Sequence, residues 1–432
     1  MIFNKQVECL APRALKDIQS KRLCRIVNYM QRKSPVYQKK FAQSRVILRK
    51  IKSINDIDHL PFTVKEDLRD TYPFGIFSAP MSDIREIHVS SGTTGNPTVV
   101  GYSKEDLDLW ANVIARSLCC AGAVPGDMIQ IAYGYGLFTG GLGLHYGSLL
   151  LGLTVIPCSS GQTKRQLKIM QDFRPRVLAC TPSYALYMAE TAGELGIDAK
   201  KSSWKIGIFG AEPWSEAMRQ QIEKRWDLEA IDIYGLSEII GPGVACECHC
   251  KNGLHVPWDV FYPEVIDPKT LKKAKPGIPG ELVVTTLTKL GMPLIRYRTR
   301  DIVTINYEKC ACGRTSPRIS KVLGRTDDMI VVRGVNVFPT QIEEVLLNIE
   351  GAEPHYQIIV ERHKGLDRLE VLVELKESFF SDEVKQLQNF EQRISKEIES
   401  VLSIGVKVRL VEPKSIERSE GKSKRIIDKR SL

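Results

Sequence analysis

Residues 206–238 read IGIFGAEPWSEAMRQQIEKRWDLEAIDIYGLSE and carry the clearest signal of the fold class. They predict a buried strand over Ile206–Phe209, a helix over Ser215–Arg225 and a second strand over Ile231–Tyr234. A strand, an amphipathic helix and another strand in this order form a βαβ unit, in which the strands are parallel and the helix covers the sheet. The stretch therefore predicts an α/β protein.

The same alternation extends from Ile84 to about Ile302. Further strands are expected at Gln130–Tyr133, Thr154–Pro157 and Val177–Cys180, and further helices at Lys104–Ala121, Lys164–Phe173 and Ser183–Leu195. The first ~80 residues read as helices and turns. We expect a large N-terminal domain, residues 1–324, with mostly parallel sheets covered by helices.

The order of expected strands and helices changes near Arg325, at the polar junction Gly324-Arg325-Thr326-Asp327-Asp328. The expected elements are strand Met329–Val332, helix Gln341–Leu347, strands Tyr356–Val360 and Glu370–Glu374, helix Ser381–Val401 and strand Val406–Leu410. About 100 residues with this order predict a small α+β domain, residues 325–432. The glycine and charged side chains of the junction suit a hinge, so we expect the small domain to be mobile.

Composition limits the classes of function. The 432 residues carry a net charge of +10, from 61 Lys and Arg against 51 Asp and Glu, and 43% are hydrophobic. No stretch approaches the ~18 apolar residues of a membrane span, and Met1 to Glu8 lack the pattern of a secretory signal. The basic residues are spread along the chain rather than striped, which disfavours a nucleic-acid partner. We expect a cytoplasmic enzyme without a membrane partner, whose substrates carry phosphates.

The sharpest local signal is residues 89–98, VSSGTTGNPT, between two apolar runs. Glycines let backbone N–H groups close around an anion, and hydroxyls add donors. The Gly-Lys-Ser/Thr ending of a Walker loop is absent, and the following residues read as a strand. The stretch therefore predicts a hairpin-like flap over phosphates, although an ordinary Gly/Ser/Thr turn has the same composition.

Three further segments follow apolar runs: Gly210-Ala211-Glu212-Pro213, Tyr234-Gly235-Leu236-Ser237-Glu238 and Arg296-Tyr297-Arg298-Thr299-Arg300-Asp301. Ligands of α/β sheets bind beyond the carboxyl ends of the strands. The segments offer an aromatic face for a base, a carboxylate for Mg²⁺ and an acid for ribose hydroxyls. Near the C-terminus, residues 418–425 read RSEGKSKR and place Lys422 after a glycine.

In this order, these segments resemble the motifs of the adenylate-forming superfamily of acyl-CoA synthetases, luciferases and peptide-synthetase adenylation domains, and most of all those of phenylacetate-CoA ligases. The resemblance extends over nearly the whole chain, including residues 133–141, YGYGLFTGG, and 333–343, RGVNVFPTQIE. It implies a nucleotide site made of Ser90, Ser91, Gly92, Thr93, Thr94, Gly95, Gly210, Ala211, Glu212, Pro213, Tyr234, Gly235, Leu236, Ser237, Asp301 and Arg325.

The resemblance also implies roles. Residues 90–95 would bind the β- and γ-phosphates, 210–213 would line the adenine, and Tyr234 would stack on it. Ser237 and Glu238 would hold the α-phosphate and Mg²⁺, and Asp301 the ribose. Asp327 would be the hinge and Lys422 the lysine of adenylation. Attack of a carboxylate on phosphorus joins two anions, so positive charge is needed in place. The alternative for Lys422 is a solvated tail lysine, and for Glu238 a helix N-terminal acid.

One departure concerns the flap. Many superfamily members have a lysine after the flap proline, and this chain has Thr98, a feature that phenylacetate-CoA ligases share. An acyl pocket is expected around Tyr135, Gly136, Phe138, Ile239 and Pro242, where aromatic rings and glycines suit a flat aromatic acid better than a long acyl chain. Core packing would explain any one of these residues equally well.

Eleven cysteines without a secretion signal argue against a disulfide framework. Five are clustered: Cys246, Cys248 and Cys250 in residues 246–250, CECHC, and Cys310 and Cys312 in residues 310–314, CACGR. With His255 they predict a structural zinc site, for which Cys248, His255, Cys310 and Cys312 are the favoured ligands. Cys246, His249 or Cys250 could replace one of them, and unpaired reduced thiols are the alternative to any metal.

The sequence therefore predicts an acid-thiol ligase (AMP-forming). It would use ATP and Mg²⁺ to turn phenylacetate or a related aryl acetic acid into an acyl-adenylate, and then transfer the acyl group to coenzyme A. An adenylation module that loads a carrier protein is the alternative, although the chain has no carrier domain and no DSL-type attachment serine. A zinc-dependent nucleic-acid binder would leave the nucleotide motifs unexplained. The resemblance also suggests a homodimer.

Overall fold

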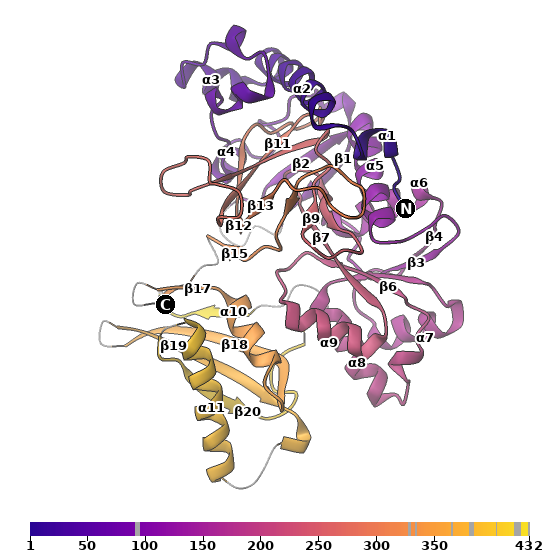
Figure 1. Ribbon diagram of the computed structural model, residues 1–432, viewed down its shortest axis with the longest axis vertical. Helices are drawn as coiled ribbons and strands as arrows, with labels where there is room; N and C mark the ends of the chain where they lie inside the picture. The colour runs from indigo at the N-terminus through magenta and orange to yellow at the C-terminus, as the bar shows by residue number, and fades with distance from the viewer. Residues whose placement is uncertain are drawn as a thin grey trace.

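The chain folds into a large body and a small body, and the small one packs against helices α8 (Pro182–Glu194) and α9 (Glu216–Trp226) of the large one (Figure 1). The computed structural model describes residues 1–90, 96–326, 330–332, 335–363, 366–379, 384–402, 404–418 and 425–430. The two bodies have separate hydrophobic cores.

A nine-stranded sheet runs through the large body in the order β13-β14-β9-β8-β7-β6-β5-β3-β4. Strands β7, β6, β5, β3 and β4 are parallel, whereas β8, β9, β14 and β13 extend the sheet with antiparallel pairings. The strands are β3 (Met128–Ile131), β4 (Thr154–Pro157), β5 (Val177–Cys180), β6 (Ile206–Gly210), β7 (Glu229–Leu236), β8 (Gly241–Glu247), β9 (Leu254–His255), β13 (Ile305–Asn306) and β14 (Arg318–Ile319).

Helices cover both faces of the parallel strands because the side chains of a strand alternate between the faces. On β5, Val177 and Ala179 belong to the core that packs under α5 (Lys104–Cys120) and α6 (Thr139–Leu151). Leu178 and Cys180 belong to the core under α7 (Thr163–Phe173), α8 and α9. The sheet is thus the middle layer of three.

A second, antiparallel sheet joins β10 (Phe261–Ile266), β11 (Gly280–Thr286), β12 (Tyr297–Val303) and β15 (Gly324–Arg325). Helices α2 (Pro12–Lys33) and α3 (Pro35–Gln43) pack beside it in a cluster that includes Leu287 and Ile295. Helix α1 (Lys5–Glu8) lies against the loop of Arg314 and Thr315, and α4 (Lys65–Arg69) contributes to the main core. A hairpin of β1 (Ile84–Val89) and β2 (Val99–Ser103) stands apart as its own sheet. Short 3₁₀ helices occupy Leu48–Lys50, Ile54–His59, Met81–Asp83, Ala199–Lys201 and Glu377–Phe379.

The small body contains a four-stranded sheet in the order β20-β19-β18-β21, in which the C-terminal strand β21 pairs in parallel with β18. Its elements are β16 (Ile330–Val332), β17 (Val335–Val337), α10 (Pro339–Leu347), β18 (Ala352–His363), β19 (Leu366–Leu375), α11 (Val384–Leu402), β20 (Lys407–Val411) and β21 (Ile426–Asp428). Apolar residues of α10, α11 and the sheet form one core.

The predicted fold class, an α/β protein with a large first domain and a small α+β second domain, is confirmed. The parallel strands of the nine-stranded sheet lie within two residues of the predicted positions. In the small body, β18 and β19 are longer than predicted, and β21 had no counterpart in the prediction. The prediction of mostly parallel sheets understates the antiparallel part, because β8 to β15 lack the helical spacers of βαβ units. The predicted helix from Ser381 begins outside the described residues, and the boundary at 324/325 stays a prediction.

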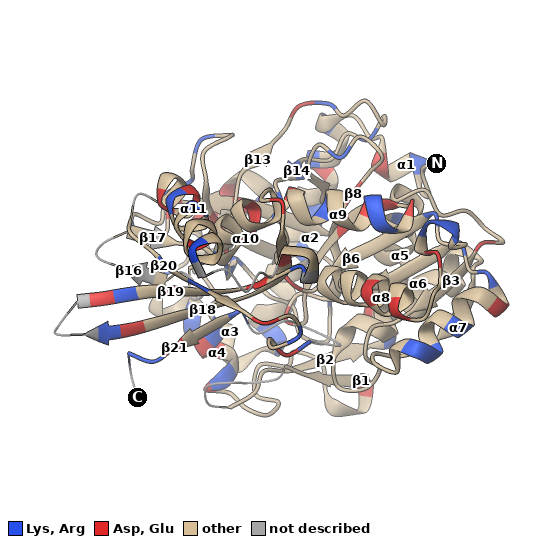
Figure 2. Cartoon of the chain, turned by 90° about the horizontal axis from the view of Figure 1, so that it is seen from below, with Lys and Arg blue, Asp and Glu red and all other residues tan. Residues whose placement is uncertain are grey.

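The charged residues of the described chain are spread over the whole molecule, with Lys and Arg interspersed among Asp and Glu (Figure 2). This agrees with the even distribution in the sequence. Among the described helices, none has both the length and the apolar character needed to cross a bilayer.

Glycines determine how closely α6 approaches α5, and this gives a first testable prediction. A Cβ on Gly143 would lie 2.3 Å from Cζ2 of the buried Trp110 ring. We expect Gly143→Ala to lower the free energy of unfolding by about 1–3 kcal/mol, as overpacking usually does. Denaturant unfolding measures the change.

The control is Gly193→Ala in α8, where the added methyl would meet no atom within 4 Å. There the better helix propensity of alanine should leave stability unchanged or raise it by up to ~1 kcal/mol. Equal stability of the Gly143 variant and the parent chain would contradict this packing argument.

Candidate active site

The base of the phosphate flap is the β1–β2 hairpin. Val89 pairs with Val99, and beyond them Ser90 N–H donates to the Thr98 carbonyl at 2.9 Å while Ser90 Oγ accepts from Thr98 N–H at 3.0 Å. The hairpin is as predicted. Ser91, Gly92, Thr93, Thr94 and Gly95 lie outside the described residues. Val89 N–H also donates to the carbonyl of Leu137 at 3.0 Å, so the flap begins beside the expected acyl pocket.

The segment expected to line an adenine follows β6. A Cβ on Gly210 would lie 2.1 Å from the carbonyl oxygen of Ile233, so β6 and β7 can approach this closely only with glycine there. Ala211 has a φ of 70°. The carboxylate of Glu212 accepts from Ser183 N–H at 2.9 Å, and Pro213 is exposed. The turn therefore lies at the carboxyl end of β6, held against the start of α8.

A carboxylate joins the ends of three strands. The Tyr234 hydroxyl on β7 donates to Asp301 Oδ2 on β12 at 2.5 Å, and Arg325 Nη1 on β15 lies 3.1 Å from Asp301 Oδ1. Burial, followed by the negative charge of Asp301, raises the pKa of Tyr234 far above the usual phenol range. The tyrosine therefore stays protonated and donates to Asp301. The three residues, far apart in the sequence, form one group.

Ser237 and Glu238 follow β7 and are both buried. Ser237 Oγ lies 3.1 Å from the Thr139 hydroxyl at the start of α6. Glu238 Oε1 lies 3.8 Å from Lys65 Nζ at the start of α4. Gly235, which pairs with Pro242, has no room for a side chain because a Cβ would lie 2.0 Å from the Gly241 carbonyl oxygen. Leu236 is half-buried at the end of the strand.

The residues of the expected acyl pocket lie on the loop before α6, in the turn after β7 and at the start of β8. Ile239 is fully buried, and Pro242 accepts a hydrogen bond from Trp110 Nε1 through its carbonyl at 3.1 Å. Tyr135 is half-buried, with its hydroxyl 3.3 Å from His145 Nδ1. Gly136 has a φ of 123°. Phe138 is among the exposed apolar side chains.

Three side chains at this site carry no signal in the sequence. Lys65 and Lys289 are single lysines among many, and Trp110 reads as one apolar position of a helix. Lys289 is fully buried, and its Nζ donates to the backbone carbonyl of Glu238 at 3.2 Å. Trp110 stacks on Tyr102 with ring centroids 5.0 Å apart. Only the contacts made across the fold distinguish them from surface or core residues.

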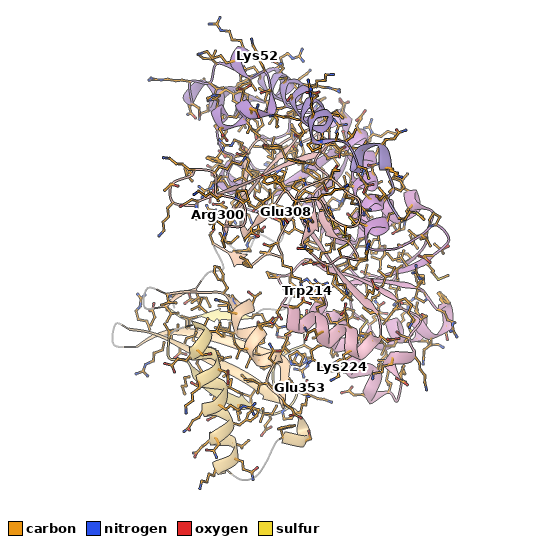
Figure 3. The ribbon with its side chains drawn as sticks, viewed as in Figure 1. Lys52, Trp214, Lys224, Arg300, Glu308 and Glu353 are labelled. Atoms are coloured by element: carbon orange, nitrogen blue, oxygen red, sulfur yellow. The ribbon has the colours of Figure 1, made fainter. Side chains whose placement is uncertain are left out.

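The small body docks close to the adenine segment. Glu343 Oε1 on α10 accepts from Ser215 N–H at 2.9 Å, and Glu344 Oε2 accepts from Ala217 N–H at 3.2 Å. Two carboxylates therefore cap the N-terminus of α9, where the helix dipole favours negative charge. Figure 3 shows Trp214 at this end of α9. Arg425 Nη2 lies 3.7 Å from Glu343 Oε2.

Ion pairs continue this interface along α8 and α9. Glu190 lies 2.6 Å from His355, 3.6 Å from Arg418 and 3.7 Å from Arg225. Arg225 also reaches Glu353 at 3.6 Å, beside the end of α9 that carries Lys224 (Figure 3). The predicted catalytic Lys422 and the predicted hinge Asp327 both lie outside the described residues.

The structure brings the four favoured metal ligands together. The ligand atoms of Cys248, His255, Cys310 and Cys312 all lie within 4.8 Å of one another. Cys248 Sγ is 3.8 Å from Cys310 Sγ, and Cys312 Sγ is 3.4 Å from His255 Nε2. Hydrogen bonds with Cys248 and then His255 lower the pKa of the Cys312 thiol far below its usual value. These four residues are called the Cys/His group below.

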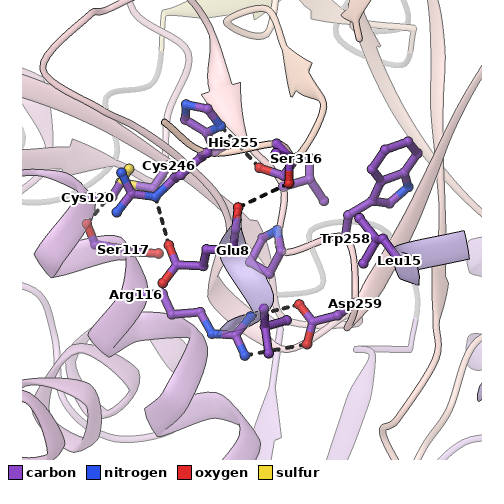
Figure 4. A pocket seen from close by; sticks show the side chains of 15 residues that line it. Glu8, Leu15, Arg116, Ser117, Cys120, Cys246, His255, Trp258, Asp259 and Ser316 are labelled. Carbon is purple, nitrogen blue, oxygen red and sulfur yellow. Dashed lines mark hydrogen bonds and ion pairs between the residues drawn. The ribbon is translucent and has the colours of Figure 1, made fainter. Parts of the chain in front are cut away.

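Cys246 fits less well as a ligand, because its Sγ donates to the Ser117 carbonyl at 3.5 Å. The ligand atoms of Cys250 and of the exposed His249 lie within 4.8 Å of that of Cys248, so these two residues stay possible replacements. A cavity of about 30 Å³ lies beside the Cys/His group, lined by Glu8, Arg116, Asp259 and His255 among others (Figure 4). An ion pair of Arg116 with Asp259 at 2.7 Å crosses it. This cavity is too small for a nucleotide or an aryl acid.

Two family models match the chain. The model described as AMP-binding enzyme matches residues 14–288, and the one described as AMP-binding enzyme C-terminal domain matches residues 334–430. The first alone spans more than half of the sequence. Together with the strand-end site, these matches define the class: an AMP-binding enzyme.

Full-length relatives narrow this class. Phenylacetate-coenzyme A ligase of Thermus thermophilus is 47% identical over 100% of both chains, and that of Escherichia coli is 46% identical over 100% of this chain and 99% of its own. The same enzyme of Pseudomonas putida is 45% identical over 96% and 94%. The chain belongs to the phenylacetate-CoA ligase family of AMP-forming acid-thiol ligases.

Solved structures of 2-hydroxyisobutyryl-CoA ligase bear on the placement of the small body. The chain matches that ligase in its postadenylation state with a TM-score of 0.94, at 28% identity over 99% of this chain and 92% of the other. Against the thioesterification state of the same ligase the TM-score is 0.73, at 29% identity over 99% and 92%. The two bodies are thus arranged as in the postadenylation state.

The carboxylates at the α9 N-terminus give a second prediction. Glu343→Ala removes the acceptor of the buried Ser215 N–H, and a buried donor without a partner costs about 1–3 kcal/mol. We expect hydrogen exchange of the Ser215 amide to rise roughly tenfold or more, as 1.4 kcal/mol per factor of ten implies.

Exchange is followed by mass spectrometry on peptides from α9. The exposed Glu350→Ala, just past the end of the same helix α10, serves as the control and should leave the exchange unchanged. Unaltered exchange at Ser215 in the Glu343 variant would mean that the small body does not protect this helix end in solution.

Proposed function

We propose that the chain uses Mg-ATP to convert phenylacetate, or a closely related aryl acetic acid, into an acyl-adenylate and then transfers the acyl group to coenzyme A. The products are aryl-acetyl-CoA, AMP and pyrophosphate. The observation that carries this proposal is the 47% identity, over the full length of both chains, to a phenylacetate-coenzyme A ligase. The strand-end geometry of the site supports it independently.

The nucleotide would lie along the carboxyl ends of β6 and β7. Asp301 would accept hydrogen bonds from the ribose hydroxyls, and it is already held by Tyr234 and Arg325. The Gly210 turn would face the adenine, with the Tyr234 ring against the base. Ser90 to Gly95 would donate to the β- and γ-phosphates. Because Asp301 is held by Tyr234 and Arg325 before ATP arrives, binding of the ribose requires little reorganisation there.

Charge is the main requirement of the first step. The acid's carboxylate attacks the α-phosphorus, the bond to the pyrophosphate oxygen breaks, and negative charge accumulates on the phosphates. Glu238 is the residue that would hold Mg²⁺, whose charge offsets that of the phosphates. Thr98 supplies no charge at the flap. Lys65, 3.8 Å from Glu238, brings an ammonium to the same end of the site from the N-terminal region.

Lys422 would complete the first step from the small body. Its segment is anchored on both sides: Arg418 pairs with Glu374 at 2.7 Å, and Arg425 packs 4.4 Å over the Tyr356 ring. Arg425 also approaches Glu343, which accepts from Ser215 N–H, two residues after Pro213. These contacts support a Lys422 segment close to the adenine turn in this arrangement.

The second step requires the thiol of coenzyme A to reach the acyl-adenylate. A rotation of the small body about Asp327 would withdraw Lys422 and open this access. The interface to be broken is rich in ion pairs and helix caps, and among the described residues Leu347 of α10 is the small-body member of the buried apolar cluster of α8 and α9, which suits a reversible motion. The domain boundary at 324/325 is part of this proposal.

The aryl substrate is proposed from the rings around the acyl loops. Tyr135 and Phe138 lie on the loop before α6, and Trp110 packs against Gly241 at the start of β8. Flat aromatic surfaces favour a flat aromatic ring. A single hydroxyl or methylene in such a pocket changes discrimination by only about 1–3 kcal/mol, so hydroxylated or indolic relatives of phenylacetate are included.

The test is pyrophosphate release from Mg-ATP with phenylacetate, indoleacetate and octanoate, each with and without coenzyme A. Sustained release with phenylacetate that depends on coenzyme A is expected. Release that stops after about one turnover despite coenzyme A would point to a carrier-protein thiol as acceptor. Absence of release with every acid would reject the proposed activity.

A third prediction accompanies this assay. Lys422→Met should lower kcat for acyl-adenylate formation at least ~100-fold, because a charge aligned with the transition state is typically worth about 3 kcal/mol. Lys424→Met, two residues away, should stay within twofold of the parent enzyme. Equal kcat values for the two variants would remove Lys422 from the reaction.

We also propose that the Cys/His group binds a structural zinc ion. A tetrahedral zinc with Zn–S bonds of ~2.3 Å and Zn–N bonds of ~2.0 Å separates two sulfurs by roughly 3.8 Å and a sulfur from a nitrogen by roughly 3.5 Å. The distances within the group, 3.8 Å and 3.4 Å, fit these edges. His255 Nδ1 lies 3.1 Å from Ser316 Oγ, which orients Nε2 toward the group.

The zinc would join two loops 62 residues apart and, through Arg314, the N-terminus. Arg314 lies 3.7 Å from Cys312 Sγ and donates to Glu8 at 2.7 Å. The zinc ion would therefore stabilise the structure and take no part in the reaction. Assembly as a homodimer and location in the cytoplasm remain predictions from the sequence.

Metal content gives the fourth prediction. The purified protein should contain about one zinc per chain, and Cys312→Ser should lose most of it and lower the Tm. Cys158→Ser, outside the group, should keep both. Zinc is measured by plasma emission spectrometry after dialysis. Full zinc content in Cys312→Ser, or none in the parent protein, would exclude this ligand set.

A further inference from the structure

Lys289 is a lysine in an unusual place. It lies between β11 and β12, its side chain is fully buried, and lysine is among the residues least often found inside proteins. An ammonium removed from water is unfavourable unless it is paired and hydrogen-bonded. Burial lowers the pKa of Lys289 to about 8, so it is still mostly charged at neutral pH. Because burial of this ammonium is unfavourable, the contacts of Lys289 are where a function for it should be sought.

Those contacts lead to the residue proposed to hold Mg²⁺. Lys289 Nζ donates to the backbone carbonyl of Glu238 at 3.2 Å and lies 5.0 Å from the centroid of the Tyr102 ring. The Tyr102 hydroxyl in turn donates to the carbonyl of Ser237 at 3.4 Å. Two consecutive carbonyls after β7 are therefore held by two side chains that contact each other.

The lysine itself is firmly positioned. Asp106, at the start of α5, accepts from Leu290 N–H and from Gly291 N–H, both at 2.7 Å, and from Ser103 N–H at 3.0 Å. The turn that carries Lys289 is thus tied to the helix start and to β2. A Cβ on Gly291 would lie 2.7 Å from the Asp106 carboxylate, so the approach needs glycine. Asp106 also supplies a buried negative charge that favours the ammonium.

We propose that Lys289 is a positioning residue for Glu238: its buried ammonium holds the Glu238 carbonyl, next to the Ser237 carbonyl held by Tyr102, so that the Glu238 carboxylate is held ready for the Mg²⁺ of the nucleotide. The proposal rests on the proposed function of Glu238. It assigns Lys289 no contact with substrate. The positive charge acts through the carbonyl of Glu238, whereas Lys65 lies beside the carboxylate itself.

The experiment compares Lys289→Met with the parent enzyme in the pyrophosphate-release assay, with Mg²⁺ titrated at saturating ATP and phenylacetate. Methionine keeps the length of the side chain and removes the charge. We expect the half-saturating Mg²⁺ concentration to rise five- to tenfold and kcat to fall about tenfold, while the KM for phenylacetate stays within twofold. The exposed Lys272→Met is the matched control and should change none of these values.

A purely structural role would lower the amount of active enzyme and leave the half-saturating Mg²⁺ concentration unchanged. An unchanged Mg²⁺ titration would therefore overturn the proposal, whether or not kcat falls. If Lys289→Met does not fold, Tyr102→Phe decides. It removes the hydroxyl donor to Ser237 and keeps the ring, and it should raise the Mg²⁺ requirement two- to fivefold. No change in that variant would equally overturn the proposal.

The two proposals fail differently. A parent enzyme without acid-dependent pyrophosphate release would reject the function itself. An active parent enzyme, combined with a normal Mg²⁺ requirement in the Lys289 and Tyr102 variants, would reject only the positioning role.

Discussion

The site depends on the carboxylate of Asp301, which joins strands of two different sheets. Tyr234 belongs to the nine-stranded sheet, whereas Asp301 and Arg325 belong to the antiparallel one. This contact ties the end of β7 to the second sheet, together with the hydrogen bond from Lys289 Nζ, between β11 and β12, to the Glu238 carbonyl. The carboxylate holds the aromatic ring and the arginine at fixed positions, and its own orientation is set by both. A ribose that replaces or joins these partners meets an acceptor already in place.

Much of the architecture could be predicted from the sequence because it depends on local patterns. The parallel strands β3 to β7 are apolar runs separated by amphipathic helices, and both signals survive in isolation. The Cys/His group could be expected because its soft ligands are clustered in the sequence, and the structure brings the four side chains together. The roles of the flap residues and of Asp301 in binding ATP stay predictions from the resemblance. The pairing of the antiparallel strands β8 to β15 could not be predicted, because apolar runs without helical spacers do not specify their partners.

The charges of the site show where sequence reasoning stops. Lys65 and Lys289 are indistinguishable in the sequence from solvated lysines, and only the tertiary contacts with Glu238 set them apart. The same holds for Glu343, which looks like one more acid of an amphipathic helix and instead caps a helix of the other body. Lys422 and Asp327 fall outside the described residues, so their roles still rest on the resemblance. Long-range electrostatic pairing has no local signature, whereas packing periodicity does.

The two glutamates of α10 have a consequence for how separable the bodies are. The amides of Ser215 and Ala217 open helix α9 in the large body, yet their acceptors are carboxylates of the small body. Each body has its own apolar core, but two backbone N–H groups of the large body find their acceptors in the small body. A fragment that contains only the large body would leave the N–H groups of Ser215 and Ala217 without these acceptors. The apolar cores divide the protein into two parts, but its hydrogen bonds do not, so the two bodies are not independent modules.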